Sequence, residues 1–174
     1  LSASTYNNKW FTELNTGLAG AGGPTPIANS YWVAPDHDDF SFGPDNSNDA
    51  PFSLTAWVNI EFNSSGHTNF PIVSKISGSS YEWGFAKIMM TGKLMFALFD
   101  NSAMALQTVV ADSALAAANH NKWIHVAAVY DHTGGSDANA MKIYLNGQKQ
   151  DVTPAGASYT AMHATAADVT VGRF

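Results

Sequence analysis

Short runs of alternating apolar and polar residues, separated by turn signals, cover most of this chain. In residues 52–60 (FSLTAWVNI) the apolar side chains fall on one face of a predicted strand and Trp57 falls on the other. Similar short strands are predicted at residues 31–34, 70–76, 81–90, 93–100, 122–131, 141–152 and 169–174.

Turn residues set how these strands connect. Thr91-Gly92 separates two strand-like runs and predicts a hairpin, and Asn146-Gly147 within 141–152 is the strongest short hairpin signal in the chain. Only residues 113–121 favour helix, for a turn or two, and the Ala/Thr/Ser-rich residues 153–167 are predicted to be loop. Many short strands with little helix indicate an all-β fold, an antiparallel sandwich or barrel.

The run KWIHVAAVYD (122–131) carries apolar residues on both faces, which predicts a strand in the middle of a sandwich that is buried from both sides. His125 lies in this strand, and a packed scaffold role is expected for it. No Ser or Asp stands at a motif position that would make His125 a catalytic base, and the sequence contains no G-x-S-x-G motif.

The N-terminal residues differ from the rest. Residues 16–26 (TGLAGAGGPTP) are too rich in Gly and Pro for a strand or helix. We therefore divide the chain into an N-terminal arm or linker, residues 1–28, and one β-sandwich domain, residues 29–174. The 174 residues suffice for one full hydrophobic core but not for two.

Composition narrows the function classes. The net charge is −6 and the basic residues are scattered singly, so nucleic acid is not an expected partner. No apolar run approaches the roughly 18 residues of a membrane span. The absence of cysteine removes disulfides, thiolate zinc sites and cysteine nucleophiles.

The order of the motifs adds a family resemblance. Residues 31–174 contain six motifs in a fixed order: FSLTAWVNI, IVSK, a YxxGF hairpin ending in KLMFALFD, KWIHVAAVYD, MKIYLNGQ and VTVGR. This series resembles the laminin-G-like/pentraxin group of concanavalin A-like jelly rolls. The resemblance implies that fold, and a recognition role for the domain.

Two departures from that group affect the expectation. Relatives continue past the VGR strand into a last strand that completes a sheet, so here we expect the N-terminal arm, a neighbouring chain or residues outside this numbering to complete it. Pentraxins place acidic calcium ligands in the loop that corresponds to SGSS (77–80), which has no carboxylate. The resemblance therefore does not extend to the pentraxin double calcium site.

Few residues are candidate metal ligands, and the cofactor that they could bind is one Ca²⁺ ion. Asp36 and Asp38 lie in the acidic segment PDHDDF (35–40), which serves equally as a solvated turn. The resemblance to laminin-G-like domains, which often bind one ion at the sandwich rim, adds Asp100 and Asn101. It also adds Asn119 and Asn121, in a loop where some relatives carry an acidic ligand.

Aromatic side chains are the candidate ligand contacts, because the apolar face of a sugar ring stacks on a flat ring. Trp32, Tyr81 and Trp83 are the candidates, and a core position is the alternative for each. Related jelly-roll hydrolases carry an E-x-D-x-x-E pattern, which the glutamates Glu13, Glu61 and Glu82 do not form. We therefore expect no catalytic residues.

The leading hypothesis is a non-catalytic extracellular or surface-displayed module, part of a larger protein or assembly, that binds a glycan or cell-surface ligand. The first alternative is a structural or decoration domain of a virus particle, fibre or surface layer, completed by neighbouring chains. A glycoside hydrolase is the third. The expected location is extracellular, at the cell surface or on a virion surface.

Overall fold

The computed structural model describes residues 2–6, 9–13, 31–43, 49–60, 69–88, 90–131, 138–157 and 159–172. Its strands are β1 (Ser2–Tyr6), β2 (Lys9–Glu13), β3 (Trp32–Ala34), β4 (Phe52–Asn59), β5 (Phe70–Ser77), β6 (Ser80–Lys87), β7 (Leu94–Asp100), β8 (Ala105–Ala111), β9 (Trp123–Tyr130), β10 (Met141–Leu145), β11 (Gln148–Lys149), β12 (Val152–Ala157) and β13 (Val169–Val171). Helix in these residues is limited to the 3-10 turns η1 (Asp38–Phe40), η2 (Ala117–Asn119) and η3 (Ala138–Ala140). None of them is long and apolar enough to cross a membrane.

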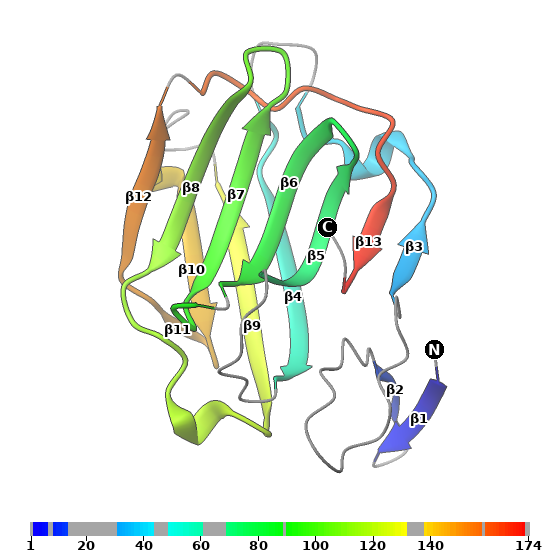
Figure 1. Cartoon of the computed structure of the whole chain (residues 1–174), viewed down its shortest axis with the longest axis vertical. Coiled ribbons are helices and arrows are strands. Elements are labelled where there is room, and N and C mark those ends of the chain that lie inside the picture. The colour runs from blue at the N-terminus through cyan, green and yellow to red at the C-terminus, as the bar shows by residue number, and fades with distance from the viewer. Residues whose placement is uncertain are drawn as a thin grey trace.

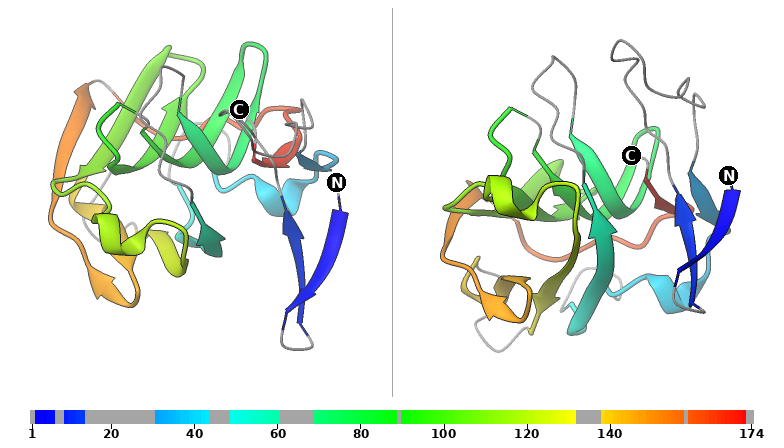
Figure 2. Two further views of the ribbon diagram at one scale, coloured as in Figure 1. Left: turned by 60° about the horizontal axis from the view of Figure 1, so that its bottom comes forward. Right: turned by 90° about the horizontal axis from the view of Figure 1, so that it is seen from below.

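The strands form two sheets that pack face to face (Figures 1 and 2). One sheet has the order β11-β10-β9-β4 and the other the order β12-β8-β7-β6-β5-β13-β3, and every pairing is antiparallel. This confirms the predicted all-β antiparallel sandwich with little helix. The strands β1 and β2 form a separate two-stranded hairpin that the sequence analysis did not anticipate, and residues 16–26 lie outside the described residues.

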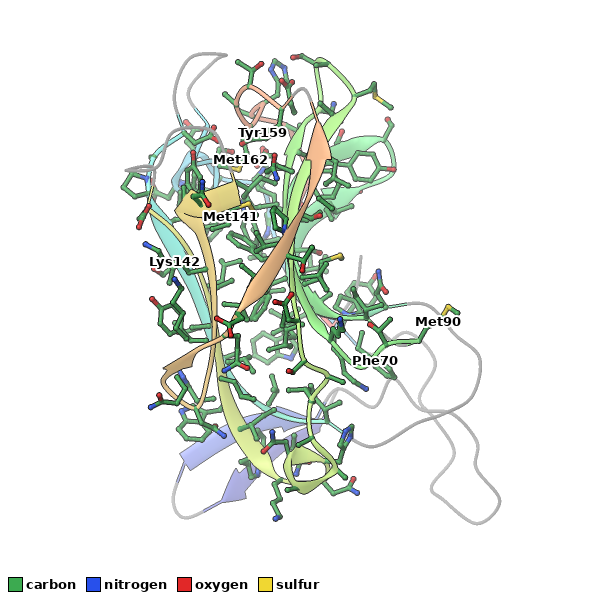
Figure 3. All side chains as sticks on the ribbon, turned by 90° about the vertical axis from the view of Figure 1, so that its left-hand side faces the viewer. Phe70, Met90, Met141, Lys142, Tyr159 and Met162 are labelled. Carbon is green, nitrogen blue, oxygen red and sulfur yellow. The ribbon has the colours of Figure 1, made fainter. Side chains whose placement is uncertain are left out.

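The core fills the space between the two sheets. Figure 3 views the sandwich from its side, with Met141 and Met162 between the layers and Lys142 on the outer side of β10. Phe52 joins the layers because its ring stacks on Phe42 at 4.1 Å and meets the edge of Phe96 at 5.8 Å. Burial alternates along β4, with Ser53, Thr55, Trp57 and Asn59 exposed and the residues between them buried or half-buried, so the alternation predicted for residues 52–60 is confirmed.

The strand β9 lies between β4 and β10, so its predicted place in the middle of a sheet is confirmed. Its inner face, which starts at Ile124, is buried throughout, but its outer face leaves Trp123 39% exposed and His125 half-buried. The prediction that β9 is buried from both sides is wrong. The seven-stranded sheet covers only the inner face, and on the outer face Trp123 is exposed and Val129 half-buried, although Ala127 is buried.

The loop predicted for residues 153–167 is wrong at its start, because β12 pairs with β8 along Val152–Ala157. Strand β8, Ala105–Ala111, was not predicted either. Pro154 and Gly156 are unfavourable in most strands, so the sequence pattern did not indicate β12. β12 is the edge strand of its sheet, where proline needs no ladder N–H on the open side.

The hairpin predictions hold. Asn146 and Gly147 have φ values of 49° and 79°, as a two-residue type I′ turn requires, and they join β10 to β11. β6 and β7 pair on either side of Thr91-Gly92. The final predicted strand is β13, which lies between β5 and β3.

A β-bulge in the long sheet places a charged pair inside the molecule. Lys75 pairs with Trp83 and Ile76 with Tyr81, so Glu82 is the extra residue of β6. The bulge reverses the alternation at that point, and Glu82 as well as Trp83 is buried. The Glu82 carboxylate meets Lys75 Nζ at 2.8 Å.

Candidate ligand-binding site

The structure separates the three aromatic residues that the sequence analysis put forward as ligand contacts. Trp83 is only 2% exposed, and its indole N–H donates to the Phe40 carbonyl at 2.9 Å. Trp83 is therefore a core residue and is withdrawn as a binding residue. Trp32 is 52% exposed on the edge strand β3, whereas Tyr81 is half-buried on the outer face of β6.

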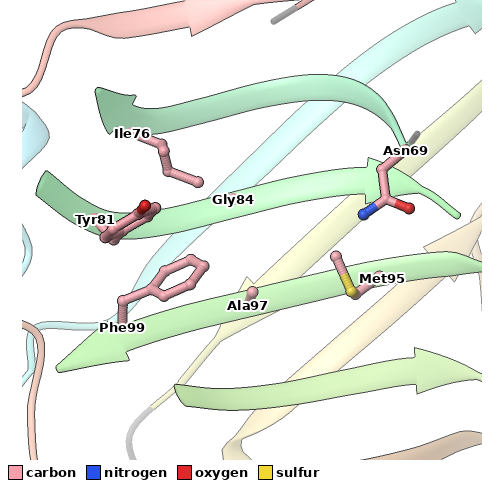
Figure 4. A pocket seen from close by; sticks show the side chains of 7 residues that line it. All are labelled: Asn69, Ile76, Tyr81, Gly84, Met95, Ala97 and Phe99. Carbon is pink, nitrogen blue, oxygen red and sulfur yellow. The ribbon is translucent and has the colours of Figure 1, made fainter. Parts of the chain in front are cut away.

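Tyr81 belongs to a shallow groove on the outer face of the seven-stranded sheet (Figure 4). The groove encloses about 280 Å³ and is mostly apolar. Gly84 and Ala97 pair across β6 and β7, and their small side chains leave room above the strands. The rings of Tyr81 and Phe99 lie 5.3 Å apart at the same end of the groove. The structure thus places Tyr81 at one end of a shallow, mostly apolar groove.

A second and more exposed aromatic surface lies on the other sheet. Trp57 is 65% exposed on the outer face of β4, directly opposite His125 of β9. The two rings meet edge to face at 5.4 Å. Trp123 lies two positions before His125 on β9, so it is the diagonal neighbour of Trp57, a relation that brings side chains within reach of each other. We call Trp57, Trp123 and His125 the tryptophan face.

The backbone beneath the tryptophan face is held by a tight hairpin. His125 N donates to Asn146 Oδ1 at 2.9 Å, and Asn146 N donates to the His125 carbonyl at 2.7 Å. Tyr144, which pairs with Ala127, adds another ring on the same side of the sheet. The histidine is thus fixed in a surface array of aromatic rings.

The outward residues of β4 and β9 next to the two tryptophans include no Asp, Glu, Lys or Arg, whereas Lys142 lies on the same face of β10. Asn59 pairs directly with Trp123, and Thr55 precedes Trp57 on the same face of β4. Both of these residues are exposed, as is Asn146. Hydroxyl and amide groups around flat rings can donate and accept hydrogen bonds, so this surface suits a neutral ligand with many hydroxyl groups.

Two of the metal candidates, Asp36 and Asp38, serve the fold. Asp36 Oδ1 accepts from Lys75 Nζ at 2.6 Å, and its backbone N–H donates to Asp168. Asp38 begins η1, and its carbonyl accepts from Ser41 N at 3.0 Å. Within the described residues no group of three or more His, Asp or Glu side chains could hold a metal ion.

Asp100 is buried at the end of β7, where its carboxylate anchors the following turn. Its Oδ1 atom accepts from Ser102 Oγ at 2.7 Å and from Ala103 N at 3.1 Å. Burial raises the pKa of Asp100, but hydrogen bonds from Ser102, Ala103 and Thr160 lower it by more, so its pKa lies below the usual value. The neighbouring Asn101 Oδ1 is buried and has no hydrogen-bond partner among the described residues.

Calcium takes six to eight oxygen ligands. The Asp100 carboxylate is surrounded by N–H and O–H donors, which repel a cation. Asn119 and Asn121 lie beyond the far end of β8, at the opposite end of the sandwich from Asp100 (Figure 1). The structure therefore does not bring the predicted rim ligands together, and a bound calcium ion stays a prediction.

Sequence reasoning named neither Trp57 nor Trp123 as ligand contacts. The alternation in residues 52–60 carried the signal for Trp57, because it is the only aromatic residue on the polar face of that strand. Trp123 had no such signal, since the apolar outer face of β9 favoured burial. Their proximity follows from the pairing of β4 with β9, which a local pattern does not contain.

Comparison with known proteins gives the family. The Laminin_G_3 family model, described as the concanavalin A-like lectin/glucanases superfamily, matches residues 26–173. No curated protein matched the sequence. The match covers most of the chain, and the two antiparallel sheets agree with it. The chain therefore belongs to the laminin-G-like group of the concanavalin A-like lectin/glucanase superfamily.

Proposed function

We propose that this domain is a non-catalytic recognition module that binds a neutral glycan through its tryptophan face, outside the cell or on a surface. The observation that supports this most strongly is the pair of exposed tryptophans on the outer face of β4 and β9, where the outward residues of these two strands include no Asp, Glu, Lys or Arg. A single exposed apolar residue is ordinary, but two exposed indoles at diagonal positions of paired strands, with His125 against one of them, are a grouping of the kind that marks binding sites.

The chemistry of a sugar ring matches this surface. One face of a pyranose presents C–H groups, which stack on an indole, and its edge presents hydroxyl groups, which need hydrogen-bond partners. Trp57 and Trp123 would contact two neighbouring parts of the glycan, and Asn59 and Thr55 would reach its edge. The flat and open shape favours an extended chain over a small enclosed ligand.

The same face argues against glycoside hydrolysis. That reaction uses two carboxyl groups roughly 5–10 Å apart across the substrate. The outer positions of β4, β9 and β10 contain no Asp or Glu. The Glu82 side chain is fully buried beside Lys75, away from any substrate. We therefore assign binding without catalysis.

A glycan array tests this proposal. Wild-type protein is expected to bind one class of neutral polysaccharide, and Trp57→Ala or Trp123→Ala is expected to weaken that binding at least about tenfold, or ~1.4 kcal/mol. The matched control is Trp32→Ala, which removes a tryptophan of similar exposure from β3. Trp32→Ala is expected to bind the same polysaccharide as tightly as the wild-type protein does, both with and without a calcium chelator.

Two outcomes would contradict the proposal. An array that stays silent with well-folded protein would remove the glycan-binding function. Binding that survives in Trp57→Ala but is lost in Tyr81→Ala would move the site to the groove on the seven-stranded sheet.

A structural role in a virus particle, fibre or surface layer is the second candidate. One observation favours it: among the residues that the structure describes, β4 pairs on one side only, with β9, at the edge of the four-stranded sheet. A strand from a neighbouring chain could add to that edge.

A further inference from the structure

A buried lysine and two carboxyl groups meet beside the long sheet, outside the tryptophan face. Lys75 Nζ lies 2.6 Å from Asp36 Oδ1 and 2.8 Å from Glu82 Oε1. The side chains of Lys75 and Glu82 are 0% exposed, and that of Asp36 is 36% exposed. Burial of charged groups is costly even when they are paired. An amide bond between the amine and one carboxyl would replace two of these charges by a neutral group.

Neighbouring segments fix the positions of the amine and of the Asp36 carboxyl. Lys75 Nζ also donates to the carbonyls of Thr165 and Ala167, at 2.8 and 2.9 Å. The backbone N–H of Asp36 donates to Asp168 Oδ1 at 3.0 Å. Because the Asp36 Cγ atom is bonded to Oδ1, it lies within about 4 Å of Nζ, and a near-attack geometry needs roughly 3–3.5 Å. A small rotation of the Asp36 side chain therefore brings its carbon within reach of the nitrogen.

Glu82 has one oxygen at the amine and one oxygen left over. Its Oε1 atom contacts Lys75 Nζ and accepts from the backbone N–H and the hydroxyl of Thr165, at 2.6 and 3.0 Å. Its Oε2 atom is buried and, in the part of the chain that the structure describes, has no hydrogen-bond partner. A buried polar atom without a partner is rare and calls for an explanation. An oxygen that carries a proton in transit between two neighbouring groups supplies one.

We propose that Lys75 and Asp36 form an intramolecular amide bond, with Glu82 as the proton carrier. One proton passes from the ammonium to the Asp36 carboxyl, which leaves both groups uncharged, and the nitrogen then attacks Cγ. Glu82 takes a second proton from the nitrogen and gives it to the Asp36 hydroxyl, whose C–O bond breaks as water leaves. The atoms balance without an oxidant or another reactant, and Glu82 is returned unchanged. The exposed part of Asp36 gives the water a route to solvent.

The bond would give this chain a covalent cross-link although it has no cysteine. It would tie β5 to the segment before η1 and close a loop across 39 positions of the sequence. A cross-link of this kind stabilises a fold mainly by restricting the unfolded chain. The contact of Lys75 with Asp36 is then the arrangement from which the bond forms. The bond does not depend on glycan binding, so each proposal can fail without the other.

Mass spectrometry of the intact, denatured chain tests the bond over a time course after folding. Wild-type protein is expected to become lighter by the mass of one water molecule. Asp36→Ala and Glu82→Gln are expected to keep their full masses, because they remove the reacting carboxyl and the proton carrier. Asp38→Ala removes an exposed carboxyl from the same segment and is the matched control, expected to lose water as the wild type does. Unfolding curves confirm that each variant is folded.

Digestion of the denatured wild-type chain after glutamate locates the bond without any variant. It yields one fragment with Asp36, residues 14–61, and another with Lys75, residues 62–82. The two fragments are expected as one branched species, lighter than their sum by one water molecule. Water lost by cyclisation of a single aspartate would leave them separate. Separate fragments, a wild-type chain that keeps its full mass, or water loss that persists in Asp36→Ala or Glu82→Gln would overturn the inference.

Discussion

At the scale of single residues, the side chain of the buried Lys75 holds several segments together at one end of the sandwich. Its Nζ atom contacts Asp36 Oδ1 at 2.6 Å and Glu82 Oε1 at 2.8 Å. It also donates to the carbonyls of Thr165 and Ala167 at 2.8 and 2.9 Å. One side chain thus joins β5 and β6 to two neighbouring segments, the one before η1 and the one before β13.

Removing this lysine is expected to be costly. The Lys75 and Glu82 side chains are both 0% exposed, so Lys75→Met leaves a buried carboxylate without its cation. We expect the free energy of unfolding to fall by about 3–5 kcal/mol, measured by urea denaturation. The double variant Lys75→Met/Glu82→Met should recover part of the loss, because no buried charge is left unpaired. A loss below about 1 kcal/mol in the single variant would show that the pair matters little.

At the scale of strands, the edge strand β12 depends on a backbone that only glycine accepts. Gly156 has φ of 115°, and a Cβ atom added there would lie 1.9 Å from the Leu106 carbonyl oxygen on β8. The two strands therefore approach each other closely enough to exclude any side chain at this position. This requirement keeps β12 in the sheet while its sequence resembles loop.

Gly156→Ala is therefore expected to detach β12 from β8. Hydrogen exchange should show faster exchange in residues 152–156 and 106–111, together with a lower midpoint of thermal unfolding. Gly78→Ala in the β5–β6 turn is the matched control. Its φ is also positive, at 59°, but nothing lies within 4 Å of the added Cβ. That control should cost only the backbone strain, about 1–2 kcal/mol. Equal effects of the two variants would contradict the account of β12.

The strands also show which information was available in the sequence. Those with a clear alternation or a strong turn signal, such as β4 and the β10–β11 hairpin, were predicted correctly. The strand β12 was missed because Pro154 and Gly156 are tolerated only through its edge position, which depends on the other strands. The inward turn of Glu82 was missed for a similar reason, since a bulge appears only when β5 and β6 are paired.

At the scale of the whole molecule, the family and the sandwich followed from motifs distributed over the chain, but the candidate site did not. Trp57 and Trp123 are 66 positions apart in the sequence and become diagonal neighbours only because β4 pairs with β9. The local sequence around Trp83 did not distinguish it from an exposed aromatic residue. Packing of the four-stranded sheet against its own sheet nevertheless buries it. Exposure is a property of how the sheets pack, and periodicity within one strand does not determine it.

The most direct test of the tryptophan face is a nuclear magnetic resonance titration of the indole N–H signals with the glycan selected by the array. The five tryptophans give five such signals, which single Trp→Phe variants assign. We predict that the signals of Trp57 and Trp123 shift in proportion to binding, while that of Trp83, bonded to the Phe40 carbonyl in the core, stays in place. Unchanged Trp57 and Trp123 signals at saturating glycan would contradict the proposed site.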